Sequence, residues 1–379
     1  MTPTVLAVGA WLKNAGCLVL HSRVHWSPVH GDLSDPLACA KLEHSVLALV
    51  QQAAEAGAPV QAIAHDLHPD FFSTQLAIAT ADALGVPAIG VQHHHAHLAA
   101  VVAEHGITGP VVGLALDGVG LGSDGTPWGG ELLWLDGAQW QRLGHLQPLA
   151  LPGGDRAARE PWRMAASALH ALGRGDQIVT RCGLVVGESV AAGVRQMLDK
   201  GLNCPMTSSA GRWFDAAAGA LGLCHRQHDE AQAASALEQA ATRALSVRPD
   251  LPPLAGALRH ADGRIDLRPV LAQLFDAPDA DLAAAGFHLA MADVLADALI
   301  AAAQARRTRT AVLGGGCFFN RILRERTVRR LVDAGLTALL PGPSGCGDAG
   351  LAIGQAWVAA QHIATPQAQT PVEETVPCA

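Results

Sequence analysis

The stretch Val111-Val112-Gly113-Leu114-Ala115-Leu116-Asp117-Gly118 decides the fold. It is a short apolar run, typical of a buried strand, with an acidic residue and a glycine where the run ends. A similar run near the N-terminus, Thr4 to Val8, ends at Gly9. Each run is followed by two further strand candidates and then by helices that alternate with strands. The sequence therefore predicts one α/β unit that occurs twice, as a repeat of pattern without obvious residue identity.

The elements of the two copies follow the same order: three strands, then helix, strand, helix, strand and helix. In the first copy the expected elements are Thr4–Val8, Cys17–Leu20, Arg23–Trp26, Pro36–Ala54, Val60–Ala64, Ser73–Leu84, Ala88–Val91 and His94–Glu104. In the second copy they are Val111–Leu116, Glu131–Leu135, Trp140–Leu146, Leu282–Ala305, Thr310–Leu313, Cys317–Val332, Ala338–Leu340 and Ala349–Ala360. Two such units favour a two-lobed α/β protein with a cleft between mixed sheets, the layout of actin and hexokinase. A single doubly wound sheet is the alternative.

The domain boundaries follow from the same pattern. We expect a first lobe over residues 1–106 and a second lobe over residues 107–365. Residues of about 150–280 interrupt the second copy with mostly helical patterns, so they are expected to form an insertion. Residues 366–379 are polar and contain prolines, and we expect a flexible tail there.

Composition excludes several classes of protein. Half of the 379 residues are hydrophobic and 16% are charged, which argues against long disorder. The net charge of −8 argues against a sequence-independent nucleic-acid binder. We see no apolar run of roughly 18 residues and no secretory signal, so we expect no membrane span and a cytoplasmic location. The eight cysteines form no Cys-x-x-Cys pair, which leaves a structural zinc finger unsupported.

The motif Gln92-His93-His94-His95-Ala96-His97 predicts a metal site. His93 and His97 are four residues apart and share one face of a helix, where two imidazoles can hold one divalent ion. The metalloprotease motif is excluded because His94 stands where that motif needs Glu. Asp117 is the best candidate for an added carboxylate ligand. A polar helix start with no metal is the alternative.

Other candidate residues have two interpretations each. Asp348 is either a ligand or a helix N-cap, and the cap is favoured from the sequence alone. Gly314, Gly315 and Gly316 form either a phosphate loop or a tight packing turn. The segment Thr207-Ser208-Ser209-Ala210-Gly211-Arg212 offers hydroxyls and a guanidinium, or a capped helix start. Lys13 either faces the cleft, where it would suit a phosphate, or is a surface lysine. Asp66 ends a strand and is expected near the cleft, with no assigned role.

Together the motifs resemble the C-terminal half of the HypF carbamoyltransferases, which mature NiFe hydrogenases. The matching segments are Leu6–Asn14, His30–Leu33, Asp66–Pro69, Gln92–His97, Asp117–Gly118, Asp124–Glu131, Pro152–Asp155, Thr207–Arg212, Gly314–Gly316 with Asn320–Arg321, and Asp348–Gly350. The resemblance implies an actin-like domain of the ASKHA type, built from an RNase H-like repeat. It also implies that His93, His97, Asp117 and Asp348 are metal ligands, with iron as the expected metal and zinc as the alternative. Thr207, Ser208, Ser209, Gly211, Arg212, Gly314, Gly315, Gly316 and Asn320 correspond to nucleotide contacts.

The function that this resemblance implies is transfer of a carbamoyl group from carbamoyl-adenylate to the C-terminal cysteine of HypE. The expected catalytic residues are His93, His97, Asp117 and Lys13. The expected nucleotide is ATP or carbamoyl-adenylate, and Mg²⁺ is a further candidate cofactor. The cysteine-rich and YrdC-like segments of a complete HypF are not visible, so we expect a shortened, stand-alone form and a separate adenylating protein as a candidate partner. The alternatives are a small-molecule O-carbamoyltransferase, an actin-fold ATPase or kinase, and a scaffold.

Overall fold

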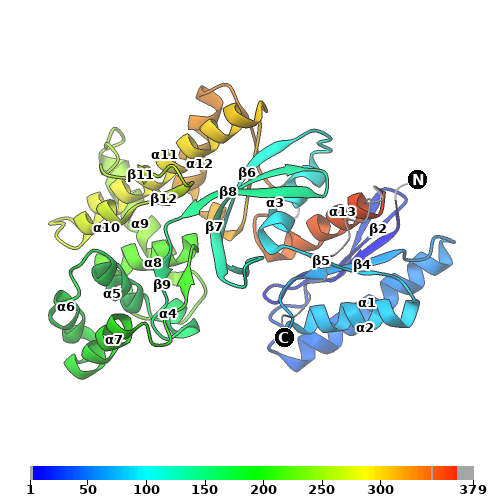
Figure 1. Cartoon of the computed structure of the whole chain (residues 1–379), viewed down its shortest axis with the longest axis horizontal. Helices are drawn as coiled ribbons and strands as arrows, with labels where there is room; N and C mark the ends of the chain where they lie inside the picture. Colours follow the sequence, from blue (N-terminus) through cyan, green and yellow to red (C-terminus); the bar gives the residue numbers. More distant parts are fainter. Residues whose placement is uncertain (1–2, 343–344, 365–379) are drawn as a thin grey trace, which may run out of the picture.

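The computed structural model describes residues 3–342 and 345–364, which form two lobes, each on its own sheet (Figure 1). The first sheet has the strand order β3-β2-β1-β4-β5. Its strands are β1 (Val5–Ala7), β2 (Cys17–Leu20), β3 (Arg23–Trp26), β4 (Ala62–Asp66) and β5 (Ala88–Val91). Strand β1 pairs antiparallel with β2 and parallel with β4, so the sheet is mixed, as predicted.

The second sheet has seven strands in the order β11-β12-β8-β7-β6-β13-β14. They are β6 (Val111–Leu121), β7 (Pro127–Asp136), β8 (Gln139–Leu146), β11 (Leu258–Arg259), β12 (Arg264–Asp266), β13 (Thr310–Gly314) and β14 (Thr337–Leu339). The five neighbouring strands β8-β7-β6-β13-β14 repeat the order β3-β2-β1-β4-β5 of the first sheet. The prediction of two related units is therefore confirmed, and a single doubly wound sheet is excluded for the described residues.

Helices α1 (Pro36–Glu55) and α2 (Phe72–Leu84) belong to the first lobe. The side chain of Asp35 accepts a hydrogen bond from the N–H of Leu37 and so caps α1, and α2 ends at Gly85 in the left-handed conformation. Apolar residues of α1 and α2 pack with Leu6, Leu18 and Ile63 of the first sheet. They cover one face of that sheet (Figure 1).

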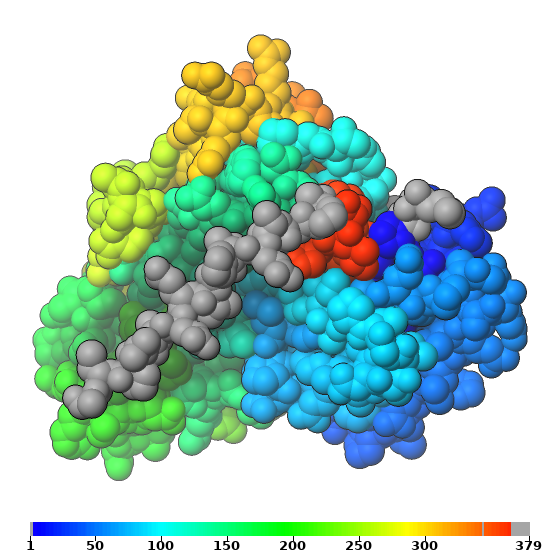
Figure 2. Space-filling model, turned by 45° about the vertical axis from the view of Figure 1, so that its right-hand side comes forward, coloured from blue at the N-terminus to red at the C-terminus, as the bar shows by residue number. Residues whose placement is uncertain are grey.

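Helices α3 (His93–Glu104) and α13 (Leu351–Ala364) lie side by side between the two sheets (Figure 1). Although α3 follows β5 of the first lobe, it packs on β6 and β13 of the second sheet. Conversely, α13 ends the second copy but packs on β1 and β4 of the first sheet. Figure 2 shows α13, in red, beside the blue first lobe. The two helices therefore connect the lobes and bring their N-termini to the place where the lobes meet.

The rest of the second lobe is mainly helical. The sheet is covered by α11 (Ala280–Arg306) and α12 (Arg321–Asp333), and the chain between β8 and α11 contains α4 (Asp155–Arg159), α5 (Pro161–Ala171), α6 (Gln177–Val186), α7 (Glu188–Lys200), α8 (Ala210–Ala220), α9 (Gln232–Val247) and α10 (Arg268–Leu274). The same interval contains the short pair β9 (Leu149–Ala150) and β10 (Met206–Thr207), and it supplies β11 and β12. Strand β12 pairs with β8, so this interval also extends the second sheet.

Helix α11 is long and apolar enough by length and composition to cross a membrane, although the sequence showed no uninterrupted apolar run of that length. In the structure, 83% of its most apolar window is buried inside the protein. It packs against α9, α12 and β6. Its apolar character is therefore accounted for by its place in the core of the second lobe.

Strand β6 and the segment after β13 differ from the sequence prediction near the expected site. Strand β6 does not end before Asp117 but continues to Leu121, with a register shift against β7 between Leu116 and Gly120. The helix expected from Cys317 begins instead as the 3₁₀ turn η1 (Gly316–Phe319), and α12 starts after Asn320. A bulge depends on the partner strand, and a 3₁₀ turn depends on how the first turn of a helix is hydrogen-bonded, so neither is visible in the hydrophobic pattern.

Candidate metal centre

The N-terminus of α3 fixes the two predicted imidazole ligands. The side-chain oxygen of Gln92 accepts a hydrogen bond from the N–H of His95 at 2.8 Å, so the helix begins at His93, one residue earlier than expected. His93 and His97 lie one turn apart with ring centroids 4.9 Å from each other, and both are buried. Their Nε2 atoms face the same point, next to Asp117.

Asp117 lies in the irregular part of β6, where the strand shifts register. Its Oδ1 accepts hydrogen bonds from the backbone N–H groups of Gly118, at 2.8 Å, and of Gly316, at 3.3 Å. Its Oδ2 lies 3.2 Å from Nε2 of both His93 and His97. One carboxylate oxygen is thus held by backbone donors and the other is directed at the two imidazoles.

Asp348 completes the group. It is the first residue of the 3₁₀ turn η2 (Asp348–Gly350), whose N-cap residue is Gly347. Its Oδ1 lies 3.4 Å from Nε2 of His97 and 3.8 Å from Nε2 of His93. One donor atom from each of the four residues lies within 4.8 Å of the other three. Two imidazole nitrogens and two carboxylate oxygens suit a divalent transition metal such as iron or zinc.

The charges in this cluster are strongly coupled. Burial lowers the pKa of His93, but the carboxylates of Asp66, Asp117 and Asp348 outweigh burial and raise that pKa well above its usual value. Burial raises the pKa of Asp117, but hydrogen bonds from His93 and His97 outweigh it and hold the pKa well below its usual value. Two carboxylates that face one point, with Asp117 buried, favour positive charge there, which a divalent cation can supply.

Asp66, for which the sequence predicted no role, contacts His93 on the side of the ring that faces away from the cluster. Its Oδ2 lies 2.7 Å from Nδ1 of His93, on the side of the ring opposite to the other ligands. Asp66 is the last residue of β4 and is completely buried. The sequence places it at a strand end, but the contact depends on how β4 lies relative to the start of α3.

The predicted segment Thr207 to Arg212 lies against the Asp117–Gly118 backbone. Ser209 caps α8, and its hydroxyl group also lies within hydrogen-bond distance of the carbonyl oxygens of Asp117 and Gly118, at 3.1 and 2.5 Å. The hydroxyls of Thr207 and Ser208 donate to Pro127 and Glu131, in that order. A side chain at Gly211 would come within 3.1 Å of Gly118, and Arg212 pairs through Nε with Asp215 at 2.6 Å. The segment therefore caps a helix and adjoins the cluster.

The glycines at the end of β13 and directly after it allow close packing. A Cβ on Gly314 would lie 2.9 Å from the carbonyl oxygen of His97, and one on Gly315 would lie 2.4 Å from that of Leu116. Gly316 supplies the N–H that holds Asp117. Asn320 caps α12 through its oxygen and donates through its nitrogen to Nε2 of His288 at 2.9 Å. The packing interpretation thus accounts for Gly314 and Gly315.

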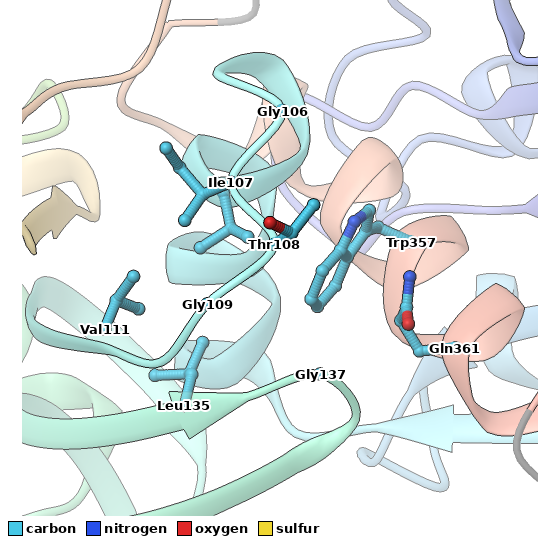
Figure 3. Close-up of a pocket in the computed structure, with 10 residues that line it drawn as sticks. Gly106, Ile107, Thr108, Gly109, Val111, Leu135, Gly137, Trp357 and Gln361 are labelled. Carbon is cyan, nitrogen blue, oxygen red and sulfur yellow. The ribbon is translucent and has the colours of Figure 1, made fainter.

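Lys13 and the cavity shown in Figure 3 lie outside the cluster. Lys13 follows β1, is half-exposed and pairs with Glu230 of the second lobe at 2.9 Å. A cavity of about 220 Å³ lies beyond the C-terminal end of α3. Figure 3 shows Ile107 and Val111 on one side of it and Trp357 and Gln361 of α13 on the other. None of the predicted site residues lines this cavity.

A two-lobed actin-like fold, with metal-type donors where its strand ends and helix N-termini meet, defines the class of this protein. Its membership follows from matches to two family models. Residues 1–104 match the HypF Kae1-like domain, and residues 113–355 match the second subdomain of the carbamoyltransferase Kae1-like domain. The chain therefore belongs to the HypF carbamoyltransferase family, as the sequence motifs predicted.

Individual relatives agree. The chain is 56% identical to a carbamoyltransferase HypF homolog of Cupriavidus necator, over 99% of this chain and 96% of that one. It is 41% identical to the carbamoyltransferase HypF of Rhizobium leguminosarum bv. viciae, of which it spans only 47%. A crystal structure of T. kodakarensis HypF superimposes with a TM-score of 0.85 at 30% identity, over 96% of this chain and 48% of that one. A crystal structure of full-length HypF in the phosphate- and nucleotide-bound form gives the same TM-score at 28% identity, over 96% and 56%.

Proposed function

We propose that this chain transfers a carbamoyl group from carbamoyl-adenylate to the C-terminal cysteine thiol of HypE, in the cytoplasm, during hydrogenase maturation. The observation that carries the proposal is the convergence of His93, His97, Asp117 and Asp348 within 4.8 Å of one another, in a member of the HypF family. A solved relative is described as bound to phosphate and nucleotide, which supports a nucleotide substrate.

These four residues would hold one divalent ion, with iron proposed and zinc as the alternative. Such an ion acts as a Lewis acid on a carbonyl or phosphoryl oxygen and neutralises charge on a leaving group. The protein's own contribution is orientation. Gly118 and Gly316 hold Oδ1 of Asp117, so that Oδ2 faces the imidazoles without reorganisation.

The nucleotide is proposed to lie beside this cluster. Ser209 and Gly211 lie against the Asp117–Gly118 backbone, and Gly315 and Gly316 lie against Leu116 and Asp117. The other proposed nucleotide contacts are Thr207, Ser208, Arg212, Gly314 and Asn320. Arg212 is mostly buried and uses Nε for Asp215, which leaves the ends of its guanidinium as proposed phosphate donors. Lys13 is proposed as a further phosphate contact, since its pairing with Glu230 places its ammonium group between the lobes.

In the proposed reaction the cysteine sulfur of HypE forms a bond to the carbamoyl carbon. The bond between that carbon and the phosphate oxygen breaks, and AMP leaves with the electron pair. A thiolate is a strong nucleophile, so this chain needs no dedicated base. A separate YrdC-like adenylating protein remains a proposed partner.

The test incubates the purified chain with HypE in two mixtures, one containing carbamoyl phosphate and ATP and the other containing carbamoyl-adenylate. We expect carbamoylated HypE in the second mixture, detected by mass spectrometry of its C-terminal peptide. Product in the second mixture alone would mean that another protein makes carbamoyl-adenylate from carbamoyl phosphate and ATP. No transfer in either mixture would contradict the proposal.

His93→Ala should remove the bound metal and reduce transfer by at least about 100-fold, since a single preorganised electrostatic contact is worth about 3–4 kcal/mol. His21→Ala is the matched control, because His21 is exposed in the turn between β2 and β3. Metal content is measured by elemental analysis of both variants. Unchanged metal content and transfer in His93→Ala would show that the cluster is not the site.

A further inference from the structure

The contact between Asp66 and His93 has a geometry that controls where the imidazole proton lies. Oδ2 of Asp66 lies 2.7 Å from Nδ1 of His93, and both side chains are buried. A carboxylate only accepts, so Nδ1 must carry the proton in this contact. Nε2 lies on the other side of the ring, 3.2 Å from Oδ2 of Asp117 and 3.8 Å from Oδ1 of Asp348, so it is the nitrogen whose lone pair a metal ion in the cluster would use.

The other oxygen of Asp66 is also used. Oδ1 accepts a hydrogen bond from the backbone N–H of His68 at 3.0 Å, in a short Asx-type turn after β4. The hydroxyl of Thr74 donates to the backbone carbonyl of Asp66 at 3.2 Å, and the ring of His68 stacks on Phe71 with centroids 4.2 Å apart. The carboxylate is thus held in one orientation by the first lobe.

We propose that Asp66 is a positioning residue that fixes His93 as the Nδ1–H tautomer and so keeps Nε2 available for the metal. The inference rests on the proposed metal site and extends it into the first lobe. Carboxylates that accept from the second nitrogen of a metal-binding histidine orient the ring and raise its basicity, and their loss costs about 10- to 100-fold in metal affinity.

The substitution Asp66→Asn discriminates this role from simple packing. Both oxygens of Asp66 face donors, so an amide must direct its NH₂ group at one of them. The backbone N–H of His68 cannot give up its proton, whereas the imidazole of His93 can change tautomer. The amide NH₂ is therefore expected to face His93. Nδ1 of His93 then accepts a hydrogen bond from this NH₂ group, and the imidazole proton lies on Nε2. The nearly isosteric variant would thus hold His93 in the tautomer that cannot bind metal.

The experiment measures Zn²⁺ affinity by competition with a chromophoric chelator, on the full chain. We expect Asp66→Asn to lower affinity about 10- to 100-fold, at least as much as Asp66→Ala. Thr74→Val is the control, because it removes a hydrogen bond to the backbone of Asp66 but leaves the carboxylate. Its affinity for Zn²⁺ should match that of the unchanged chain.

A spectroscopic measurement reports on the tautomer directly. Long-range proton–nitrogen NMR spectra of the chain labelled with ¹⁵N-histidine should show a proton on Nδ1 of His93, and no proton on Nδ1 in Asp66→Asn. The His93→Gln variant identifies the signals. If the unchanged chain does not bind Zn²⁺, both the metal site and this inference fail. If it binds Zn²⁺ and Asp66→Asn binds equally well or keeps the proton on Nδ1, the inference alone is overturned.

Discussion

Gly316 supplies Asp117 with a backbone donor and leaves little room for a side chain. A Cβ at this position would lie 3.2 Å from Oδ1 of Asp117, which is closer than ordinary contact. Gly316→Ala should therefore shift the carboxylate by a few tenths of an ångström and lower metal affinity, with a small effect on the free energy of unfolding. Metal titration and thermal denaturation check both expectations. Gly193→Ala on α7, where a Cβ meets open space, should leave metal affinity unchanged. Equal affinity in the two variants would contradict this account of Asp117.

His288 makes a prediction about acid stability. Burial lowers its pKa from 6.5 to about 4, although the hydrogen bond to the carbonyl of Ala284 opposes this shift. The unfolded chain binds a proton at this residue below pH about 6.5, and the folded chain does so only below about pH 4. Stability should therefore fall as pH decreases through this range, with His288 accounting for about 3 kcal/mol.

The variant His288→Gln tests that prediction, because glutamine does not titrate. Urea unfolding at pH 7 and pH 4.5 should show a smaller loss of stability in the variant than in the unchanged chain. His21→Gln is the control, as His21 is exposed. An identical decline in His288→Gln and the unchanged chain would show that His288 does not remain neutral when folded.

Part of the site could be predicted from single residues. The spacing of His93 and His97 and the strand-end position of Asp117 were sufficient to predict that they lie together, and the structure brings them within hydrogen-bond distance. Asp348 could not be separated from a helix cap on local pattern, because its partners are more than 200 residues away. Asp66 shows the same limit, since its partner is determined by tertiary packing.

At the scale of elements, the site depends on how closely α3 and α13 approach. A Cβ on Gly354 of α13 would lie 1.9 Å from the carbonyl oxygen of Ala96 in α3. The obstructing atoms are backbone, so they cannot rotate away. Gly354→Ala should separate the helices, costing about 1–3 kcal/mol or more in the free energy of unfolding.

Because His97 directly follows Ala96, the same substitution should also weaken metal binding. Denaturant unfolding and Zn²⁺ titration measure the two effects, with Gly193→Ala again as the control. A Gly354→Ala chain with unchanged stability would mean that the helices can move apart without cost. That result would remove the argument that their crossing holds the ligands in place.

At the scale of the whole molecule, the repeated pattern identified the two sheets because hydrophobic periodicity survives where residue identity does not. The pattern did not indicate that α3 packs on the second sheet and α13 on the first. Periodicity shows that a helix has a buried face but not which sheet covers that face. Short strands such as β11 and β12 were likewise missed, since two or three residues carry no period.

The two halves use equivalent positions differently. His97 is the fifth residue of α3 and contacts Asp117 in β6, while Gln355 is the fifth residue of α13 and contacts Gly9, just past β1. The side-chain oxygen of Gln355 accepts from the N–H of Gly9 at 3.0 Å, and its nitrogen lies 3.3 Å from the carbonyl oxygen of Gly9. In one half the helix and strand are thus in contact through the ionisable side chains of His97 and Asp117. In the other half they are joined by the neutral amide of Gln355.

This division predicts that substitutions at the two positions separate stability from metal binding. Gln355→Met leaves both backbone groups of Gly9 buried without a partner, so it should cost about 1–3 kcal/mol in the free energy of unfolding and little metal affinity. His97→Ala should abolish metal binding. Denaturant unfolding without metal, together with Zn²⁺ titration, measures both quantities. Loss of Zn²⁺ affinity in a folded Gln355→Met chain, equal to that in His97→Ala, would show that the two helix–strand contacts act as one unit rather than as two halves with separate roles.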